Sequence, residues 1–175
     1  MLYELFKKYH ANKEIEHGLL YDELFSPYKD SDIAVLEIGI QTGRSLKAFG
    51  DYFTKARIFG IDKLGNFPEG VGRAITFEGN VLNGKFMANT IGRIGKIDII
   101  IDDGAHTPDT QQAAFTALFP VCQKFYIIED LHAMLLPGYY RKGYVVTENF
   151  LKQNHIPVKY HRCHNYNKDI GVITK

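Results

Sequence analysis

Short apolar runs alternate with amphipathic stretches along this chain. The runs are four to six residues long and rich in isoleucine and valine, which is typical of strands buried on both faces of a sheet. They cover residues 33–38, 57–61, 97–101 and 125–128. Between them, apolar residues recur at helical spacing, as Leu46, Phe49 and Phe53 do. Strands that alternate with helices predict an α/β fold with a doubly wound, Rossmann-like parallel sheet.

Three further strands complete the predicted sheet. Residues 73–78 alternate weakly, which favours an edge strand. Residues 157–164 and 170–173 alternate more clearly and are separated by a turn-like segment, so we expect an antiparallel hairpin at the C-terminal end. The sequence therefore predicts seven strands, mostly parallel, with a C-terminal antiparallel hairpin.

The first 30 residues have a different pattern, with two polar-aromatic helical stretches joined by a loop over residues 9–18. We interpret residues 1–30 as an N-terminal helical cap on the sheet, with a part in covering a cofactor or substrate as the alternative. Residues 31–175 form the body of the domain. At 175 residues the chain is long enough for one domain with a real core.

Composition narrows the classes of partner. The net charge of +1 gives no bulk electrostatic reason to expect nucleic acid or an anionic membrane. No run approaches the roughly 18 apolar residues of a membrane helix, and residues 1–8 contain an acid and lack the apolar centre of a signal peptide. Cys122 and Cys163 are in no metal-like or redox-like spacing. We therefore expect a reduced, cytoplasmic setting.

Polar residues follow two of the apolar strands where folding alone does not require them. The strand at 97–101 leads into Asp102, Asp103, Gly104 and His106, and the strand at 125–128 leads into Glu129-Asp130-Leu-His132. The carboxyl ends of parallel strands meet at one edge of the sheet, where ligands bind. Carboxylates on adjacent strand ends are suitable ligands for a hard dication such as Mg²⁺. Asp102 and Asp103 should point to opposite faces, with Asp102 toward a cofactor and Asp103 toward a metal.

The first strand ends in a glycine-containing turn. The pattern is Glu37-x-Gly39-x-x-x-Gly43, and Gln41 stands where a dinucleotide fingerprint would have its second glycine. Asp62 ends the second strand, where an acid can accept hydrogen bonds from both hydroxyls of a ribose. Asn80 follows the third strand, where a third cofactor contact is expected. These residues predict a nucleoside-binding site.

Each candidate also has a structural interpretation. Asp102 and Asp103 could be turn or helix-capping acids, and His106 could be a turn histidine satisfied by its neighbours. His132 is an alternative base to His106, and the sequence does not rank the two. We expect no zinc site at His161, Cys163 and His164, because alternation puts His164 on the opposite face.

With these residues placed, the chain resembles class I S-adenosylmethionine-dependent methyltransferases. Residues 37–43 look like the first motif of that superfamily, and Asp62 looks like its ribose-binding acid. More narrowly, residues 101–106 and 127–132 resemble the paired motifs of the metal-dependent macrolide-sugar O-methyltransferases of the mycinamicin and tylosin type. Residues 9–21 are similar to the opening of that family.

The resemblance implies an O-methyltransferase with S-adenosylmethionine and Mg²⁺ as cofactors. His106 would be the general base, and a hydroxyl of a glycan or polyhydroxylated small molecule the acceptor. It implies metal ligation by Asp103 and Asp130, with Glu129 nearby. The family usually has an acid where this chain has Asn80. The implied cofactor-binding residues are Glu37, Gly39, Ile40, Gln41, Gly43, Asp62, Asn80 and Asp102.

Two other functions stay open at this point. A methyltransferase on nucleic acid or protein would need a basic groove, which the sequence does not show. A non-catalytic S-adenosylmethionine-binding protein would not need the acid–acid–Gly–x–His stretch. The residues that select the acceptor should lie in 1–30 and 131–150, the least patterned parts. No membrane partner is expected, and a homo-oligomer that completes the site is left open.

Overall fold

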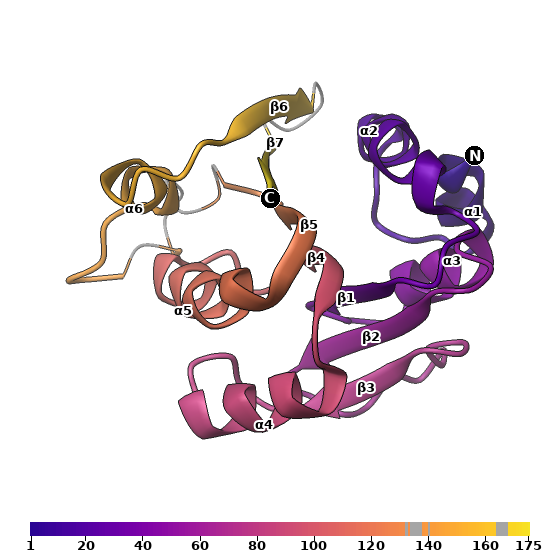
Figure 1. The fold of residues 1–175 in the computed structure, drawn as a ribbon, viewed down its shortest axis with the longest axis horizontal. Coiled ribbons are helices and arrows are strands. Elements are labelled where there is room, and N and C mark those ends of the chain that lie inside the picture. The colour runs from indigo at the N-terminus through magenta and orange to yellow at the C-terminus, as the bar shows by residue number, and fades with distance from the viewer. Residues whose placement is uncertain (132, 134–137, 140, 164–167) are drawn as a thin grey trace.

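The computed structural model describes residues 1–131, 133, 138–139, 141–163 and 168–175. It contains a seven-stranded sheet with the strand order β3-β2-β1-β4-β5-β7-β6 (Figure 1). The strands are β1 (Ala34–Ile38), β2 (Arg57–Asp62), β3 (Ile75–Glu78), β4 (Ile97–Asp102), β5 (Cys122–Ile128), β6 (Lys159–Cys163) and β7 (Lys168–Thr174).

The pairing of the strands confirms the predicted fold class. The strands β1 to β5 are paired in parallel, whereas β7 runs antiparallel to both β5 and β6. The chain order reverses between β1 and β4, which is the switch point where doubly wound sheets bind their ligands. The predicted edge position of β3 is also confirmed.

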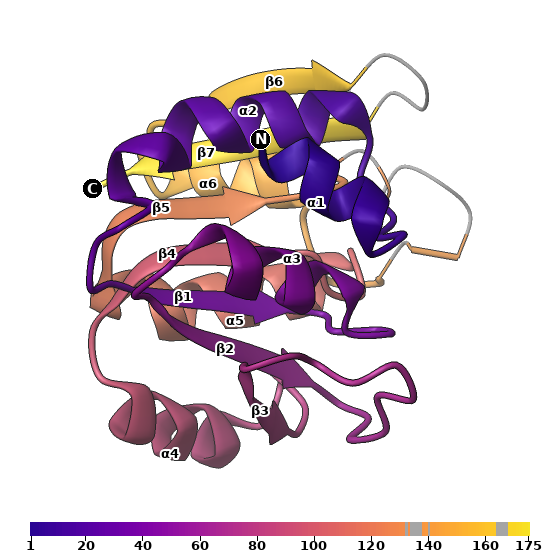
Figure 2. The same cartoon turned by 90° about the vertical axis from the view of Figure 1, so that its right-hand side faces the viewer.

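Helices cover both faces of the sheet (Figures 1 and 2). One face carries α1 (Leu2–Lys8), α2 (Ile15–Phe25) and α3 (Arg44–Tyr52), and the other carries α4 (Gly84–Ile94), α5 (Pro108–Leu118) and α6 (Thr147–Gln153). Short 3₁₀ turns follow α2 and α5, at Ser26–Tyr28 and Phe119–Val121. Among the described residues, no helix has the length and apolar character that a membrane crossing requires.

The core is divided by the sheet into two apolar clusters. Ile99 and Ile101 of β4 pack on the side of α1 to α3, and Ile97 and Ile100 pack on the side of α4 to α6. All four isoleucines are 0% exposed, as expected for a strand buried on both faces. Burial of these strands fixes the position of their carboxyl ends. It thereby also fixes the position of the polar residues that follow.

Two boundaries differ from the sequence prediction by three residues or more. α2 begins at Ile15, inside the loop that was expected over residues 9–18. Gly18 in its first turn lets α2 cross close to α1, since a Cβ there would collide with Tyr3. β5 begins at Cys122 rather than at Phe125. The first residues of β5 include polar ones, because Gln123 is exposed near the start of the strand. The apolar pattern alone therefore does not reveal this part of β5.

Candidate active site

The carboxyl ends of β1, β4 and β5 are joined by backbone hydrogen bonds that continue past the strands. The Asp103 N–H donates to the Ile38 carbonyl at 3.0 Å, and the Glu129 N–H donates to the Asp102 carbonyl at 2.9 Å. Gly39, Asp103 and Glu129 therefore follow the last paired residues in one row across the sheet. The predicted juxtaposition of the two acidic motifs is present in the structure.

Gly39 sits where only glycine fits. Its φ is +88°, in the left-handed region, and a Cβ would collide with the backbone carbonyl of Asp103. The turn after β1 and the turn after β4 are thus in direct backbone contact. This contact places the glycine turn and the acidic motif in one site.

Asp62 holds the turn that follows β1. Its Oδ2 accepts hydrogen bonds from the N–H groups of Ile40 at 2.8 Å and Gln41 at 3.1 Å. Its Oδ1 accepts one from the Leu64 N–H at 2.9 Å. Gln41 has a φ of +51°, a conformation that is uncommon for a residue with a side chain. The acid that was predicted to bind a ribose is therefore fixed at the mouth of the turn.

A cavity of about 570 Å³ lies over these strand ends. Among the described residues, most of the predicted site residues line it, whereas Glu37 and Gly43 do not, and His132 lies outside the described residues. The predicted residues that line it are Gly39, Ile40, Gln41, Asp62, Asn80, Asp102, Asp103, His106, Glu129 and Asp130.

Glu37 lies beneath the cavity, and its side chain is fully buried. The Ser45 hydroxyl donates to Glu37 Oε2 at 2.7 Å, whereas Oε1 has no hydrogen-bond partner in the part of the chain that the structure describes. Burial raises the pKa of Glu37 to about 8, although the Lys13 charge and the Ser45 hydrogen bond act in the opposite direction. A buried acceptor without a partner is a costly group for folding alone.

Asp102 and Asp103 point to opposite faces, in agreement with the prediction. Asp102 is 2% exposed and accepts hydrogen bonds from the Gly104 N–H at 3.4 Å and the Tyr126 hydroxyl at 3.5 Å. Burial raises the pKa of Asp102 to about 7. Asp103 instead lies on the side of the sheet that carries α1 to α3, where it meets Lys13. Asp102 lines the cavity, which is consistent with a place beside a cofactor. That contact itself stays a prediction.

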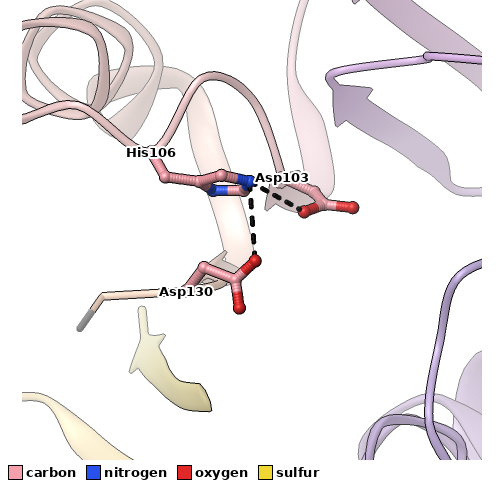
Figure 3. Close-up of side chains that lie close together, drawn as sticks. All are labelled: Asp103, His106 and Asp130. Carbon is pink, nitrogen blue, oxygen red and sulfur yellow. Dashed lines mark ion pairs between the residues drawn. The ribbon is translucent and has the colours of Figure 1, made fainter. Parts of the chain in front are cut away.

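Asp103, His106 and Asp130 form a cluster with one ligand atom each, all within 4.8 Å of one another. His106 Nε2 lies 3.8 Å from Asp103 Oδ1 and 3.5 Å from Asp130 Oδ2 (Figure 3). Asp130 Oδ1 and His106 Nδ1 are buried and have no hydrogen-bond partner among the described residues. Both His106 and Asp130 have a φ of +54°, a conformation that occurs preferentially at functional sites. The two carboxylates supply the oxygen ligands that a hard divalent cation prefers, and the imidazole beside them could act as a base or as a ligand of a softer metal.

Glu129 is arranged differently from the other predicted metal ligands. Its Oε1 accepts hydrogen bonds from the Lys13 ammonium at 2.7 Å and the Tyr21 hydroxyl at 2.5 Å. Its Oε2 lies 3.2 Å from His17 Nε2. Burial alone would raise the pKa of Glu129, but the charges and hydrogen bonds of Lys13 and His17 hold it below its ordinary value. The structure directs this carboxylate to the N-terminal cap and does not bring it into the cluster, so its metal ligation stays a prediction.

Lys13 is the site residue that the sequence reasoning missed. Its side chain is 3% exposed, and its ammonium pairs with both Asp103 and Glu129. Burial alone would lower the pKa of Lys13, but these two carboxylates raise it. The signal that could have revealed it is the spacing of Lys13, His17 and Tyr21, which recur every four residues, so that His17 and Tyr21 share a face of α2 and Lys13 lies just before the start of that helix.

Neighbouring groups act on the pKa of Asp103 in opposite directions. Burial and the Glu129 charge raise the pKa of Asp103 to about 6, and the Lys13 charge and hydrogen bond limit that increase. Its two oxygens have separate neighbours, since Oδ2 meets Lys13 and Oδ1 faces His106. The carboxylate is thus shared between the N-terminal cap and the cluster.

Comparison of the sequence with known proteins finds curated relatives over about two thirds of the chain, while no protein-family model matches it. The 8-demethyl-8-(2-methoxy-alpha-L-rhamnosyl)-tetracenomycin-C 3'-O-methyltransferase of Streptomyces olivaceus is 36% identical over 129 residues, which are 69% of this chain and 33% of that protein. The mycinamicin VI 2''-O-methyltransferase of Micromonospora griseorubida is 31% identical over 68% of this chain and 32% of its own length. The matched segment is thus about a third of each of these relatives.

Solved structures match a larger part of the chain. The MycE methyltransferase of the mycinamycin biosynthetic pathway, in complex with Mg, SAH and mycinamycin VI, has a TM-score of 0.81 at 26% identity. The match covers 99% of this chain and 54% of that one. A putative caffeoyl-CoA O-methyltransferase from Staphylococcus aureus shares the fold, with a TM-score of 0.65 at 17% identity.

Proposed function

Because the chain is homologous to the sugar O-methyltransferases of natural-product biosynthesis and has the class I methyltransferase fold, we propose that it is the catalytic part of such an enzyme. It would transfer a methyl group from S-adenosylmethionine to a hydroxyl of a glycan or polyhydroxylated small molecule. The observation that supports this best is the Asp103–His106–Asp130 cluster, which opens into the same cavity as Gly39 and Asp62.

The glycine turn and Asp62 are the proposed cofactor site. S-adenosylmethionine, when bound, supplies an electrophilic methyl group. Gly39 lets a ligand approach the backbone, and Asp62 would accept hydrogen bonds from the ribose hydroxyls in addition to the N–H groups that fix it. Asn80 lines the cavity and would contact the nucleoside in place of the acid of the related family. The remaining residues of the proposed cofactor site are Glu37, Ile40, Gln41, Gly43 and Asp102.

Asp103 and Asp130 would hold the divalent cation, with Glu129 as a predicted further ligand. A bound dication lowers the pKa of a hydroxyl that it contacts and fixes the approach of that hydroxyl. His106 Nε2 faces the two carboxylates across the cluster, and it would take the proton of the acceptor hydroxyl there. His132, which lies outside the described residues, remains the alternative base.

The N-terminal cap and the segment after β5 would bind the acceptor. Ala11, Asn12 and Lys13 line the cavity from one side, and Arg141 lines it as well. This supports the prediction that residues 1–30 and 131–150 select the acceptor, and it favours the alternative in which the cap helps to cover the cofactor or substrate. Cytoplasmic localisation remains a prediction from the use of cysteine, and the division into cap and body remains a proposal.

Methyl transfer from labelled S-adenosylmethionine to a panel of glycosylated macrolides and polyketides tests the function. The expected result is label in the sugar, loss of that label with EDTA, and recovery with excess Mg²⁺. Transfer that EDTA does not affect would overturn the metal-dependent mechanism. Label in RNA or protein but not in sugars would favour the alternative acceptors, and binding of S-adenosylhomocysteine without any transfer would favour a non-catalytic protein.

A further inference from the structure

We propose that Gln111 is a positioning residue for the turn of Glu129 and Asp130 that follows β5, here called the metal-binding turn. This inference rests on the proposed function, because it assumes a divalent cation at the carboxylates of that turn. Gln111 lies in α5, is 1% exposed and does not line the cavity. It is not part of the glycine turn or of the two acidic motifs.

Both ends of the Gln111 side-chain amide are hydrogen-bonded in the interior. Its Nε2 donates to the Glu129 carbonyl at 3.2 Å, and its Oε1 accepts from the Thr147 hydroxyl at 2.7 Å. A carbonyl can only accept, so the amide nitrogen must face Glu129, and the hydroxyl, which can rotate, donates to the amide oxygen. Thr147 is 0% exposed. The two contacts therefore fix both the position and the orientation of the amide.

The Glu129 carbonyl belongs to the peptide group that joins Glu129 to Asp130. On its other side Glu129 is fixed by the sheet, since its N–H donates to the Asp102 carbonyl at 2.9 Å. The orientation of the peptide group between Glu129 and Asp130 sets the φ of Asp130, which is +54° and costly for a residue with a side chain. The hydrogen bond from Gln111 offsets part of that cost, because it holds this peptide group in place.

The backbone conformation of Asp130 decides where its carboxylate points. In the observed conformation Asp130 Oδ2 lies 3.5 Å from His106 Nε2, in the cluster that also contains Asp103. A change of Asp130 to an ordinary negative φ would carry this carboxylate away from the cluster. Gln111 therefore acts on a metal ligand through the backbone, as the outer contacts of metal sites commonly do.

The same side chain joins the two ends of the segment that follows β5. The segment leaves the sheet at Glu129 and enters α6 at Thr147, and Gln111 is bonded to both residues. The neighbouring Gln112 also contacts this segment, since its Nε2 donates to the Val145 carbonyl at 2.6 Å. Two glutamines of one helix thus hold the segment, and of these two it is Gln111 that is bonded to the metal-binding turn.

Calorimetric titration of the purified chain with Mn²⁺ tests this role without any acceptor. Gln111→Met has nearly the same size and removes both hydrogen bonds. It should weaken Mn²⁺ binding by about tenfold, because loss of an outer contact of a metal ligand typically costs about 10- to 100-fold in affinity. Thr147→Val keeps the bond to Glu129 but removes the donor that orients the amide, so it should cause a smaller loss. Thr147→Ser keeps a hydroxyl and should bind as the wild type does.

Gln112→Met is the matched control, because it changes the same residue type on the same helix and removes the contact with Val145. It should leave the affinity for Mn²⁺ unchanged. If Gln111 served only to hold α6 against α5, both methionine variants would lower the stability to urea, and both would leave the affinity unchanged. Urea unfolding of the same proteins separates this structural role from the proposed one.

Equal Mn²⁺ affinities in the wild type and in Gln111→Met would overturn the proposal, and so would an equal loss in Gln112→Met. If Gln111→Met does not fold, the two Thr147 variants decide, and equal affinities in these two would overturn it. A wild-type chain that binds no Mn²⁺ would overturn this inference together with the metal site of the proposed function. A failure to find an acceptor would count against the proposed function alone, because the titration does not depend on methyl transfer.

Discussion

The Lys13 ammonium donates to Glu129 Oε1 at 2.7 Å, although the two residues are 116 positions apart in the sequence. Both side chains are 3% exposed, so the pair is excluded from solvent. One partner precedes α2 and the other follows β5, which means that the N-terminal cap is fixed to the acidic edge of the sheet. A change in how the cap docks on the sheet should therefore also move the carboxylates of the candidate active site.

Glu129→Gln should loosen the cap from the sheet. The variant removes the charge that Lys13 and His17 face, and breaking such a buried pair costs on the order of 3 kcal/mol in the free energy of unfolding. Urea unfolding measures this loss, and limited proteolysis within residues 1–28 reports the docking of the cap. Glu4→Gln, in an exposed pair with Lys7, should change the stability by less than about 0.5 kcal/mol. Equal effects of the two variants would contradict this account of the cap.

Asp62→Asn should weaken the binding of S-adenosylhomocysteine by about 10- to 100-fold, the range for the loss of hydrogen bonds to a charged acceptor. The carboxylate accepts three backbone N–H groups, and an amide nitrogen cannot accept in place of an oxygen. Fluorescence or calorimetric titration measures the dissociation constant. Glu78→Gln, at the exposed end of the neighbouring strand β3, is the control and should leave it unchanged. If Asp62→Asn binds as the wild type does, the ribose assignment is wrong.

His106→Gln separates two roles for the imidazole. As a general base, His106 contributes to turnover by about 10²- to 10⁴-fold and little to metal affinity. As a third ligand, which the spacing of the cluster also allows, it contributes mainly to metal affinity. We expect a large loss of turnover with a Mn²⁺ affinity close to that of the wild type. A loss of affinity comparable to that in Asp130→Asn would identify His106 as a ligand instead.

Glu37 should make the unliganded protein less stable as the pH rises. Burial raises the pKa of Glu37 from 4.5 to about 8, so between these values the folded protein holds a proton that the unfolded chain releases. The free energy of unfolding therefore falls over this range, by at most about 1.4 kcal/mol per pH unit from this group. Glu37→Gln cannot ionise, and its stability relative to the wild type should increase from pH 5 to pH 8. Denaturant unfolding at the two pH values measures the difference, and parallel pH profiles for the two proteins would contradict it.

The sequence was sufficient for the architecture and for the residues after each strand. Buried strands such as β4 are apolar on both faces, and their periodicity needs no knowledge of distant residues. The parallel order then brings Gly39, Asp62, Asp103 and Asp130 to one edge. The local hydrophobic pattern, together with the known topology of doubly wound sheets, was therefore enough to predict the strands and the position of these four residues.

The contacts between distant elements could not be predicted in the same way. Glu129 and Asp130 are neighbours in the sequence and equally acidic, but only the folded cap shows that Glu129 faces Lys13, His17 and Tyr21. Gln111 likewise donates to the Glu129 carbonyl at 3.2 Å, a contact between α5 and the residue after β5 that no local pattern indicates. Such pairs depend on how helices dock on the sheet, and helical spacing alone does not determine their partners.

The backbone contact at Gly39 gives the proposed cofactor and metal sites a common wall. A ligand that shifts the turn after β1 also shifts the Asp103 carbonyl behind it, because no side chain lies between them to absorb the movement. Occupancy of one side should therefore alter affinity on the other. Thermodynamic reciprocity requires the two effects to be the same factor, so S-adenosylhomocysteine must change the affinity for Mn²⁺ exactly as much as Mn²⁺ changes the affinity for S-adenosylhomocysteine.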